Sequence, residues 1–361
     1  MKIACVGYLH GAGGAERQII MLANELSKRK HEVHLIVLVE NKSKYEIEEN
    51  VNIHDLTVYE CNGKNRIINR YNILKKELKK IKPDISIHYW LQSAYLCSFM
   101  KKKISGKIIY SERGNPGDAE YNGMLGVVRS MAFNRVAGFV FQTEGAKNYF
   151  KRHIQKKSVI ICNSVDIPKD KYKQPCACRE KKIVSVGRLH HQKNQKILIE
   201  AFSKITKEFP DYTLDIYGDG ILREELQNQI NRLGLEDKII LHHSTRDILD
   251  YVYTASLFVL TSDYEGMPNA LMEAMALGVP CISTDCRPGG ARFLIEDGIN
   301  GWIVPVNNPN LLADKMKVVL SHVDNMEAII KEGIKIRTRF SNEEVFDSWE
   351  EFCQQVNEKG H

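Results

Sequence analysis

The chain has 361 residues, which is too long for one compact core, so we expect two domains of ordinary size. Its 43% hydrophobic and 27% charged residues exclude a disordered chain, and arginines 129 and 135 interrupt residues 125–141, the longest apolar candidate for a membrane span. Nine cysteines without a CxxC pair indicate free thiols in a reducing cytoplasm, and the short apolar start of the chain does not resemble a signal peptide.

The net charge of +6 is unevenly distributed. Basic clusters lie in the N-terminal half at Lys75, Lys76, Lys79, Lys80, Lys101–Lys103, Arg152, Lys156 and Lys157. Each cluster alone is typical of a solvated helix face. Together they predict that this half faces an anionic partner, such as a phospholipid surface or a polyprenyl diphosphate. Nucleic acid is not expected, because no aromatic and basic module interleaves with these lysines.

The first half of the chain alternates strand-like and helix-like segments. We expect strands at 2–7, 33–39, 84–88, 107–111 and 138–142, and helices at 15–29, 66–81, 92–102 and 124–137. Apolar strands that alternate with helices favour a parallel sheet covered by helices.

The alternation stops and then restarts. Residues 166–182 contain two prolines, lose the pattern and are expected to form a linker. We then expect strands at 183–187, 213–217, 239–242, 257–261 and 280–284, and helices at 194–208, 221–233, 246–254, 268–277, 308–320 and 324–337. The sequence thus predicts an α/β protein with two Rossmann-like, doubly wound domains, 1–165 and 183–342, that face each other across a cleft. An amphipathic helix within 343–361 is expected to pack back on the first domain.

The two halves open alike. KIACVGYLH at 2–10 and KIVSVGRLH at 182–190 share six of nine residues. Each is expected to be the opening strand of its domain, ended by a glycine that permits a tight turn.

The first opening strand leads into GAGGAE, residues 11–16. This segment has Glu16 where a dinucleotide fingerprint, GxGxxG, needs a glycine at its sixth position, and it lacks the GK of a Walker loop. Gly13 and Gly14 would still let a ligand approach the N-terminus of the following helix. The alternative is an ordinary tight turn.

The second opening strand leads into cations, and a later segment carries two glutamates. Arg188 and Lys193 follow the strand in GRLHHQKN, while Glu265 and Glu273 belong to SDYEGMPNALMEAMALGVP, residues 262–280. Eight helical residues span about 12 Å, so the two carboxylates suit two parts of an extended ligand better than a carboxylate dyad. Glutamates that accept hydroxyl hydrogen bonds, with cations and a helix N-terminus facing a diphosphate, predict a nucleotide-sugar site. Taken singly, each of these residues could be an ordinary surface residue.

These motifs resemble those of the retaining GT-B glycosyltransferases of family 4, the group 1 transferases. The resemblance rests on GGAE, GRL with QKN, GDG followed by LREEL, the two glutamates of EGMPNALMEAMA, and STDCRPGGAR at 283–292. The chain is similar in particular to members that extend bacterial lipid-linked or surface oligosaccharides.

The resemblance implies roles for the site residues. Glu265 would contact the hydroxyls of the transferred sugar and Glu273 the ribose, while Arg188 and Lys193 would neutralise the diphosphate, so that Glu265, Arg188 and Lys193 form the catalytic set. The other implied donor contacts are Gly13, Gly14, Gly266, Met267, Asn269, Ala270, Thr245 and Arg246, the last two near the base.

The resemblance also implies an acceptor region in the first domain. Many relatives place a histidine there near the donor sugar, whereas this chain has SERGNP at 111–116. Glu112, Arg113 and Asn115 are therefore expected to bind the acceptor.

The function expected from these residues is transfer of a hexose or N-acetylhexosamine from a nucleotide diphosphate sugar, UDP-linked, to a glycan acceptor. The resemblance implies retention of configuration, and a lipid-linked acceptor in O-antigen, capsule or related surface polysaccharide synthesis. No metal and no cofactor are expected, because the residues around the diphosphate are cationic and no DxD carboxylate pair stands at a strand end. A cytoplasmic enzyme, peripheral at the inner face of the plasma membrane, is expected. The alternatives are a nucleotide-sugar epimerase of the same fold and a non-catalytic scaffold.

Overall fold

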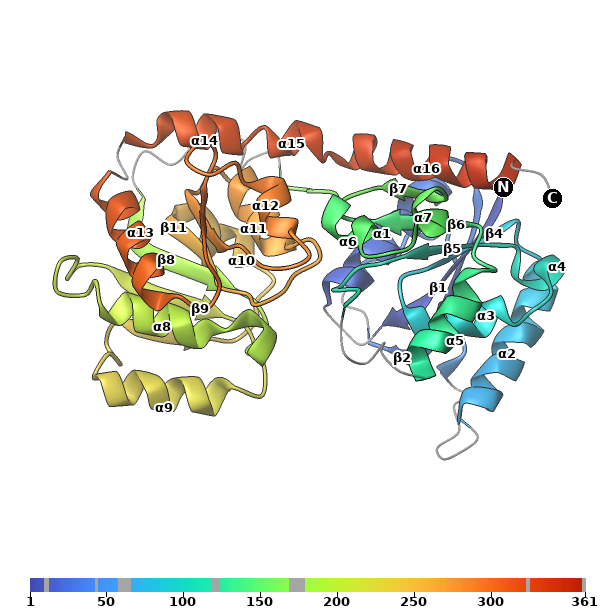
Figure 1. Ribbon diagram of the computed structural model, residues 1–361, viewed down its shortest axis with the longest axis horizontal. Helices are drawn as coiled ribbons and strands as arrows, with labels where there is room; N and C mark the ends of the chain where they lie inside the picture. Colours follow the sequence, from blue (N-terminus) through green and yellow to red (C-terminus); the bar gives the residue numbers. More distant parts are fainter. Residues whose placement is uncertain are drawn as a thin grey trace. The chain divides into compact units, whose positions relative to one another are not determined.

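The computed structural model describes residues 1–9, 13–42, 45–57, 66–117, 124–168, 179–322 and 325–358. The chain divides into two compact units (Figure 1), which are Met1–Ser164 with Glu343–His361, and Val165–Asn342. Each unit is built on its own parallel sheet. None of the helices in the described part of the chain is long and apolar enough to cross a membrane.

Unit 1 contains a seven-stranded sheet in the order β3-β2-β1-β4-β5-β6-β7. Its strands are β1 (Lys2–Leu9), β2 (Glu32–Asn41), β3 (Asn52–Asp55), β4 (Ile85–His88), β5 (Lys107–Ser111), β6 (Gly138–Phe141) and β7 (Ser158–Ile160). Its helices, apart from the last helix of the chain, are α1 (Gly14–Lys28), α2 (Arg66–Ile81), α3 (Leu91–Ser98), α4 (Lys102–Ser105), α5 (Met124–Phe133), α6 (Glu144–Asn148) and α7 (Arg152–Gln155). The strand order reverses between β1 and β4, which is the point where doubly wound sheets bind ligands.

Unit 2 contains a six-stranded sheet in the order β10-β9-β8-β11-β12-β13. Its strands are β8 (Glu180–Val186), β9 (Thr213–Tyr217), β10 (Ile239–His242), β11 (Ala255–Leu260), β12 (Cys281–Thr284) and β13 (Trp302–Val304). Its helices are the 3-10 turn η4 (His191–Lys193), α8 (Gln195–Ser203), α9 (Arg223–Leu233), α10 (Ile248–Thr254), α11 (Asn269–Ala276), α12 (Gly290–Leu294), α13 (Pro309–Ser321), α14 (Glu327–Gly333) and α15 (Ile336–Arg339). The reversal of strand order falls between β8 and β11, the strands that precede the Arg188 and Glu265 loops.

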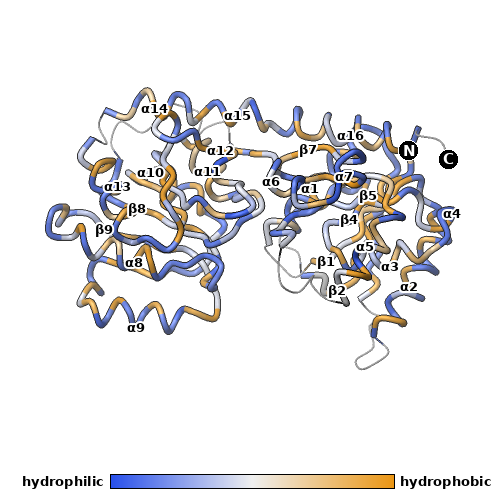
Figure 2. The backbone as a smooth tube through the Cα atoms, in the orientation of Figure 1, coloured by the Kyte–Doolittle hydropathy of each residue, from blue (hydrophilic) through white to orange (hydrophobic). Residues whose placement is uncertain are grey.

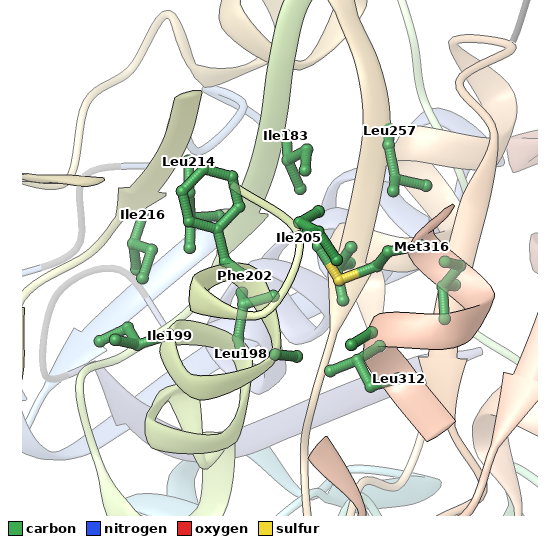
Figure 3. Packing of buried hydrophobic residues seen from close by; sticks show 14 of the residues in the cluster. Ile183, Leu198, Ile199, Phe202, Ile205, Leu214, Ile216, Leu257, Leu312 and Met316 are labelled. Atoms are coloured by element: carbon green, nitrogen blue, oxygen red, sulfur yellow. The ribbon is translucent and has the colours of Figure 1, made fainter. Parts of the chain in front are cut away.

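The core of unit 2 follows from the apolar spacing of its helices (Figure 3). Leu198, Phe202 and Ile205 recur at helical spacing, and all three are fully buried against apolar side chains of the central strands. Burying one such side chain contributes about 1.5–3 kcal/mol. The strands appear mainly orange in Figure 2 because a parallel sheet covered on both faces needs nearly continuous apolar strands.

The last helix, α16 (Asn342–Glu358), packs against unit 1. Its buried face includes Phe346, Trp349 and Phe352 at helical spacing. Gly138 in β6 leaves room for this face, since a Cβ there would lie 2.8 Å from atoms of Phe352 and Val356.

The α/β class with two parallel sheets is confirmed, but some predicted boundaries are wrong. Unit 2 begins at Val165, and Glu180–Lys182, expected in the linker, open β8 because they pair with β9 and β11. Most of the predicted linker, 169–178, lies outside the described residues. The short strands β3, β7 and β13 and the short helices α6, α7 and α12 were not predicted. The helix expected at 324–337 is divided into α14 and α15. The helix expected at 92–102 already ends at Ser98, and the separate short helix α4, which begins at Lys102, was not predicted.

Candidate functional site

The loops that follow β8 and β11 bring Lys193 and Glu265 together. The Lys193 ammonium forms an ion pair with Glu265 Oε1, and the Ser262 hydroxyl donates to the same oxygen at 2.9 Å. Both charged side chains are largely buried, with 17% of Lys193 and 10% of Glu265 exposed. Because the two loops leave neighbouring strands at the same edge of the sheet, residues far apart in sequence meet in one charged site.

Hydrogen bonds that involve the main chain hold these two loops in register. The Gln192 carbonyl accepts from the Asp263 amide at 2.8 Å, and the Gln192 side chain donates to the Tyr264 carbonyl at 2.9 Å. The Thr261 hydroxyl donates to the Lys193 carbonyl at 2.9 Å. The ion pair is therefore held by a fixed backbone and does not depend on two flexible loops.

Sequence reasoning missed several residues that build this site. Ser262, Gln192 and Asn194 had no assigned role, although Asn194 adopts a left-handed conformation with φ of 45° and donates to Asp263 Oδ1 at 2.8 Å. The QKN triplet carried a usable signal, because asparagine is enriched at left-handed positions.

Arg188 lies at the same edge of the sheet but is exposed. Its Nη2 is 3.5 Å from Gln192 Oε1, which is a weak contact, while its carbonyl accepts from Gln195 Nε2 at 2.9 Å. The backbone beside it is tightly packed, since a Cβ on Gly218 would lie 2.0 Å from the Gly187 carbonyl oxygen. The loop is thus fixed while the guanidinium faces solvent.

The N-terminus of α11 is the third component of the site. Pro268 occupies the N-cap without a side-chain hydrogen bond to the first turn. The first amides of such a helix have no intrahelical partner and carry part of the helix dipole, which suits an anion. Asn269 and Ala270 are half-buried there, and Met267 is buried.

Glycine is required beside this turn. A Cβ on Gly290 would lie only 1.9 Å from the carbonyl oxygen of Gly266, so α12 and the turn before α11 touch through backbone. Glu273 lies one turn into α11 and is half-buried.

Asp219, in the GDG segment, binds the segment that was expected near the base. Its carboxylate accepts from the Ser244 amide at 3.1 Å, the Ser244 hydroxyl at 2.5 Å and His243 Nδ1 at 2.5 Å. The Ser244 hydroxyl, followed by His243, holds the pKa of Asp219 well below its usual range. Thr245 Oγ1 accepts from the Asp247 amide at 3.2 Å, and Arg246 is exposed. Asp219 therefore orders the segment that begins at His243 and Ser244.

In unit 1, Gly13 is the N-cap of α1 and Gly14 its first residue. Gly13 has φ of −76°, an extended conformation that other residues also adopt, so its backbone does not demand glycine. A Cβ there would lie 3.3 Å from the Glu16 carboxylate. The preceding residues of the GAGGAE segment, 11 and 12, lie outside the described part of the chain.

The predicted acceptor residues follow β5. The buried Glu112 carboxylate accepts from the Tyr110 hydroxyl at 2.9 Å and the Gly114 amide at 3.1 Å, and Asn115 Oδ1 accepts from the Gly117 amide at 3.2 Å. The Arg113 guanidinium lies over the Tyr89 ring, 4.0 Å from its centroid, and burial lowers the pKa of Arg113. Glu112 and Asn115 thus stabilise the turn locally, whereas Arg113 reaches across to the end of β4.

No group of three or more histidine, cysteine or acidic side chains that could hold a metal ion is present among the residues that the structure describes. The charged groups of the site are instead the Lys193–Glu265 pair and Arg188.

Two doubly wound parallel sheets, with a C-terminal helix that belongs to the first unit, define the GT-B class of glycosyltransferase folds. Residues 166–336 match the family model "Glycosyl transferases group 1", and residues 12–169 match "Glycosyltransferase Family 4". The two matches together span most of the chain, which belongs to the group 1 glycosyltransferases of family 4.

Relatives of similar length include bacterial enzymes of lipid-linked oligosaccharide assembly. The chain is 29% identical to a Campylobacter jejuni N-acetylgalactosamine-N,N'-diacetylbacillosaminyl-diphospho-undecaprenol 4-alpha-N-acetylgalactosaminyltransferase, with 94% of this chain and 95% of that protein covered. It is 26% identical to an uncharacterized glycosyltransferase of Haemophilus influenzae, with 94% and 95% covered. The protein is therefore a glycosyltransferase with relatives in lipid-linked oligosaccharide synthesis.

Solved structures show the same fold. Anabaena Alr3699/HepE in complex with UDP has a TM-score of 0.80 at 18% identity, covering 98% of this chain and 100% of that chain. Sucrose-phosphate synthase from Thermosynechococcus elongatus has a TM-score of 0.82 at 16% identity, covering 98% of each chain.

Proposed function

We propose that the protein transfers a hexose or N-acetylhexosamine from a UDP-sugar to a lipid-linked glycan acceptor, with retention of configuration, in the synthesis of a surface polysaccharide such as O-antigen or capsule. The observation that carries this proposal is the buried Lys193–Glu265 ion pair, at the sheet edge where the α11 N-terminus also lies without a side-chain cap. A cation, a carboxylate and the amides at a helix N-terminus match the phosphates and hydroxyls of one donor.

Each donor-binding residue has a proposed role. Lys193 and Arg188 neutralise the diphosphate, aided by the amides around Met267, Asn269 and Ala270 in and beside the first turn of α11. Glu265 binds hydroxyls of the transferred sugar next to the turn at Gly266, and Glu273 binds the ribose. Negative charge on the diphosphate grows as the sugar departs, so fixed positive groups at this position stabilise the transition state more than the ground state.

The choice of UDP is supported by the structural neighbours. Alr3699/HepE was solved with UDP and with UDP-glucose, and the pneumococcal O-GlcNAc transferase GtfA with UDP and GlcNAc. The segment 243–247, which includes Thr245 and Arg246 and which Asp219 orders, is the proposed contact for the base.

A front-face reaction is the proposed route to retention. Glu265 is engaged by Lys193 and Ser262, an arrangement that suits hydroxyl binding better than nucleophilic attack. The leaving phosphate oxygen would then accept the proton of the acceptor hydroxyl as the new glycosidic bond forms.

The proposed roles of unit 1 are acceptor binding and membrane attachment. Gly13 and Gly14 are proposed to lie against the donor, and Glu112, Arg113 and Asn115 to bind the acceptor. The proposed lipid carrier agrees with relatives whose names contain diphospho-undecaprenol. The enzyme would then work at the inner face of the plasma membrane.

The basic clusters of unit 1 support an anionic surface as partner. Helices α2 and α4, which carry two of the clusters, pack together. Lys102 and Lys157, from different clusters, line one cavity of about 640 Å³ together with Lys107 and Arg135. Cations distant in sequence therefore share one surface, where anionic lipid would be attracted by about 1 kcal/mol per basic residue.

Sedimentation with liposomes tests this attachment. We expect binding that requires anionic lipid and weakens with salt, because such attraction is screened within about 10 Å at 0.1 M ionic strength. Lys102→Glu with Lys157→Glu should weaken it, whereas the exposed Lys207→Glu in unit 2 serves as control. Equal binding to neutral vesicles would contradict the proposal.

The central experiment is a thermal-shift screen across nucleotide sugars, followed by incubation with the radiolabelled donor and lipid-linked acceptors. A donor at 100 times its dissociation constant stabilises the folded state by about 2.7 kcal/mol. Transfer of label supports the proposal. Isomerisation of the donor would indicate an epimerase, and binding without reaction a non-catalytic scaffold.

A further inference from the structure

Arg113 lies against two aromatic side chains of unit 1 that come from distant parts of the sequence. Its guanidinium carbon lies 4.0 Å from the centroid of the Tyr89 ring, which follows β4, and 5.7 Å from that of Trp349 in α16. The two rings themselves stack, with centroids 6.0 Å apart and an interplanar angle of 30°. The last helix of the chain thus helps to position a cation at the carboxyl edge of the sheet.

Arg113 uses only part of its hydrogen-bond donors within the described structure. Nη1 donates to Asn163 Oδ1 at 2.6 Å, and that oxygen also accepts from Gln142 Nε2 at 2.7 Å. The Nε and Nη2 atoms are buried and have no hydrogen-bond partner in the described structure. Arg113 also forms no ion pair with a carboxylate of the described residues, although the charge of the neighbouring Glu112 favours its charged form.

Burying the positive charge of Arg113 lowers the stability of the folded protein when no anion is bound beside it. Removing a charged group from water loses its solvation, and a cation over an aromatic face recovers only part of that free energy. Other polar atoms at the same edge are also buried without partners among the residues that the structure describes, namely Ser111 Oγ, Gln142 Oε1 and Ser164 Oγ. Such a group of unsatisfied atoms calls for a ligand or ordered water.

We propose that Arg113 binds a phosphate ester of the acceptor, and that Trp349 of α16 is the positioning residue that orients its guanidinium. The inference rests on the proposed function and deepens its acceptor site. Arginine presents a planar fork of donors that matches phosphate oxygens, and two of the Arg113 donors, Nε and Nη2, have no partner among the described residues. The carboxyl edge of a parallel sheet is where such folds bind ligands.

Trp349 is assigned this role because of its burial and contacts. It is 1% exposed, so it cannot itself cover a ligand as a mobile surface residue would. Its ring instead stacks on Tyr89, the ring that lies under the guanidinium. Loss of the indole would let Tyr89 and Arg113 adopt other rotamers, while phenylalanine would keep an aromatic face in place.

The test uses the full chain saturated with UDP, so that the nucleotide site of unit 2 is occupied, and geranyl diphosphate as the probe. Calorimetry should detect binding that Arg113→Gln and Trp349→Ala each weaken by about tenfold or more. Trp349→Phe should restore affinity close to that of the wild type. Arg339→Gln in unit 2 is the matched control, because Arg339 also lies near aromatic rings, 4.9 Å from the centroids of Phe293 and Phe340.

UDP affinity and melting temperature separate a positioning role from a structural one. We expect the UDP affinity to stay near the wild-type value in Arg113→Gln and Trp349→Phe. Without a ligand, the melting temperature of Arg113→Gln should be no lower than that of the wild type, because the substitution removes a buried charge, while that of Trp349→Phe should stay near it. Equal binding of geranyl diphosphate by Arg113→Gln and the wild type would overturn the inference. So would a Trp349→Ala protein that loses UDP and geranyl diphosphate affinity in the same proportion. Failure of the wild type to bind UDP would instead count against the proposed donor.

Discussion

The two units have the same architecture, but they differ in whether the charged side chains at the carboxyl edges of their sheets are paired within the protein. In unit 2, Lys193 is paired with Glu265, and Asp219 accepts three hydrogen bonds from Ser244 and His243. In unit 1, Arg113 lies on aromatic rings and has no ion-pair partner among the described residues. Charges that are neutralised within the protein are preorganised at little cost, whereas an uncompensated buried cation gains stability from a bound anion.

This contrast fits a division of labour between the units. A donor site that must stabilise developing charge benefits from groups that are already fixed before the reaction. An acceptor site can obtain part of its order from the ligand itself. The experiments below would each break or sharpen this distinction, beginning with the largest expected effect.

Removal of the cations in unit 2 should have the largest effect on transfer. Arg188→Ala and Lys193→Ala should each slow the reaction by about 10²- to 10³-fold, which corresponds to about 2.7–4 kcal/mol of transition-state stabilisation. Arg188 is exposed, so its loss should leave the melting temperature unchanged. Lys193→Ala should also lower it, because Glu265 would remain buried without its partner.

Lys196→Ala is the matched control for these variants. Lys196 lies three residues after Lys193 and forms a surface ion pair with Glu225. Its removal should change neither transfer nor stability measurably. Near-normal rates of transfer in both the Arg188 and the Lys193 variants would contradict the donor site described for unit 2.

The backbone contact beside α11 should be the next most sensitive feature. Gly290→Ala places a Cβ 1.9 Å from the Gly266 carbonyl oxygen and must displace the turn that precedes the helix. We expect a loss of about 1–3 kcal/mol in stability and weaker nucleotide-sugar binding, measured by chemical denaturation and calorimetry. Gly114→Ala in unit 1 is the control, since its nearest atom would lie at 3.7 Å. If Gly114→Ala lowered stability and nucleotide-sugar binding as much as Gly290→Ala, the close backbone contact beside α11 would not explain the loss.

A pH effect is expected from His88 in unit 1. Burial lowers the pKa of His88 from 6.5 to about 3, so its imidazole is neutral in the folded protein at neutral pH. The protein has its full free energy of unfolding above pH 6.5, where His88 is neutral in both states. Between pH 6.5 and pH 3 protonation of His88 in the unfolded chain lowers this free energy, by about 2 kcal/mol at pH 5. Melting temperatures of the wild type and His88→Gln at pH 7.5 and pH 5 measure it. The wild type should lose more stability on acidification than the variant, and parallel losses would rule out this assignment.

Asp219 should contribute a smaller effect in unit 2. Asp219→Asn removes the charge that holds Ser244 and His243, and an exposed hydrogen bond of this kind contributes about 1 kcal/mol. UDP should therefore bind several-fold less tightly in calorimetry. Asp211→Asn, which disrupts an exposed ion pair with Lys181, should leave UDP affinity unchanged. A wild-type affinity in Asp219→Asn would mean that the ordering of residues 243–245 has no effect on the nucleotide.

The smallest expected effect is that of chelation. Since Arg188, Lys193 and the α11 N-terminus supply the positive charge proposed to face the diphosphate, transfer should proceed undiminished in EDTA. A rate that falls on chelation and returns with manganese or magnesium would show that unit 2 relies on a metal for charge that we assign to its own side chains.

The sequence alone determined the architecture and the residue types of the proposed donor site. Periodic apolar residues predicted α2, β9 and β10 with their observed bounds, because strand and helix spacing is a local property of the chain. The same reasoning identified the loops of Lys193 and Glu265, which follow apolar strands and carry charged motif residues. The short strands β3, β7 and β13 escaped it, since a few residues contain too little pattern to separate a strand from a loop.

Tertiary structure alone decided which of these residues meet. The Lys193–Glu265 ion pair depends on β8 and β11 lying next to each other in the sheet. The contact of Trp349 with Arg113 depends on the return of α16 to unit 1, and nothing in the periodicity of α16 shows which strand end its indole will reach. A local pattern shows that the apolar face of a helix or strand gains free energy when it is buried. That gain is similar for many possible packing partners, because the hydrophobic effect is not directional. The choice of partner is made by chain topology and close packing, which appear only when the whole unit has folded.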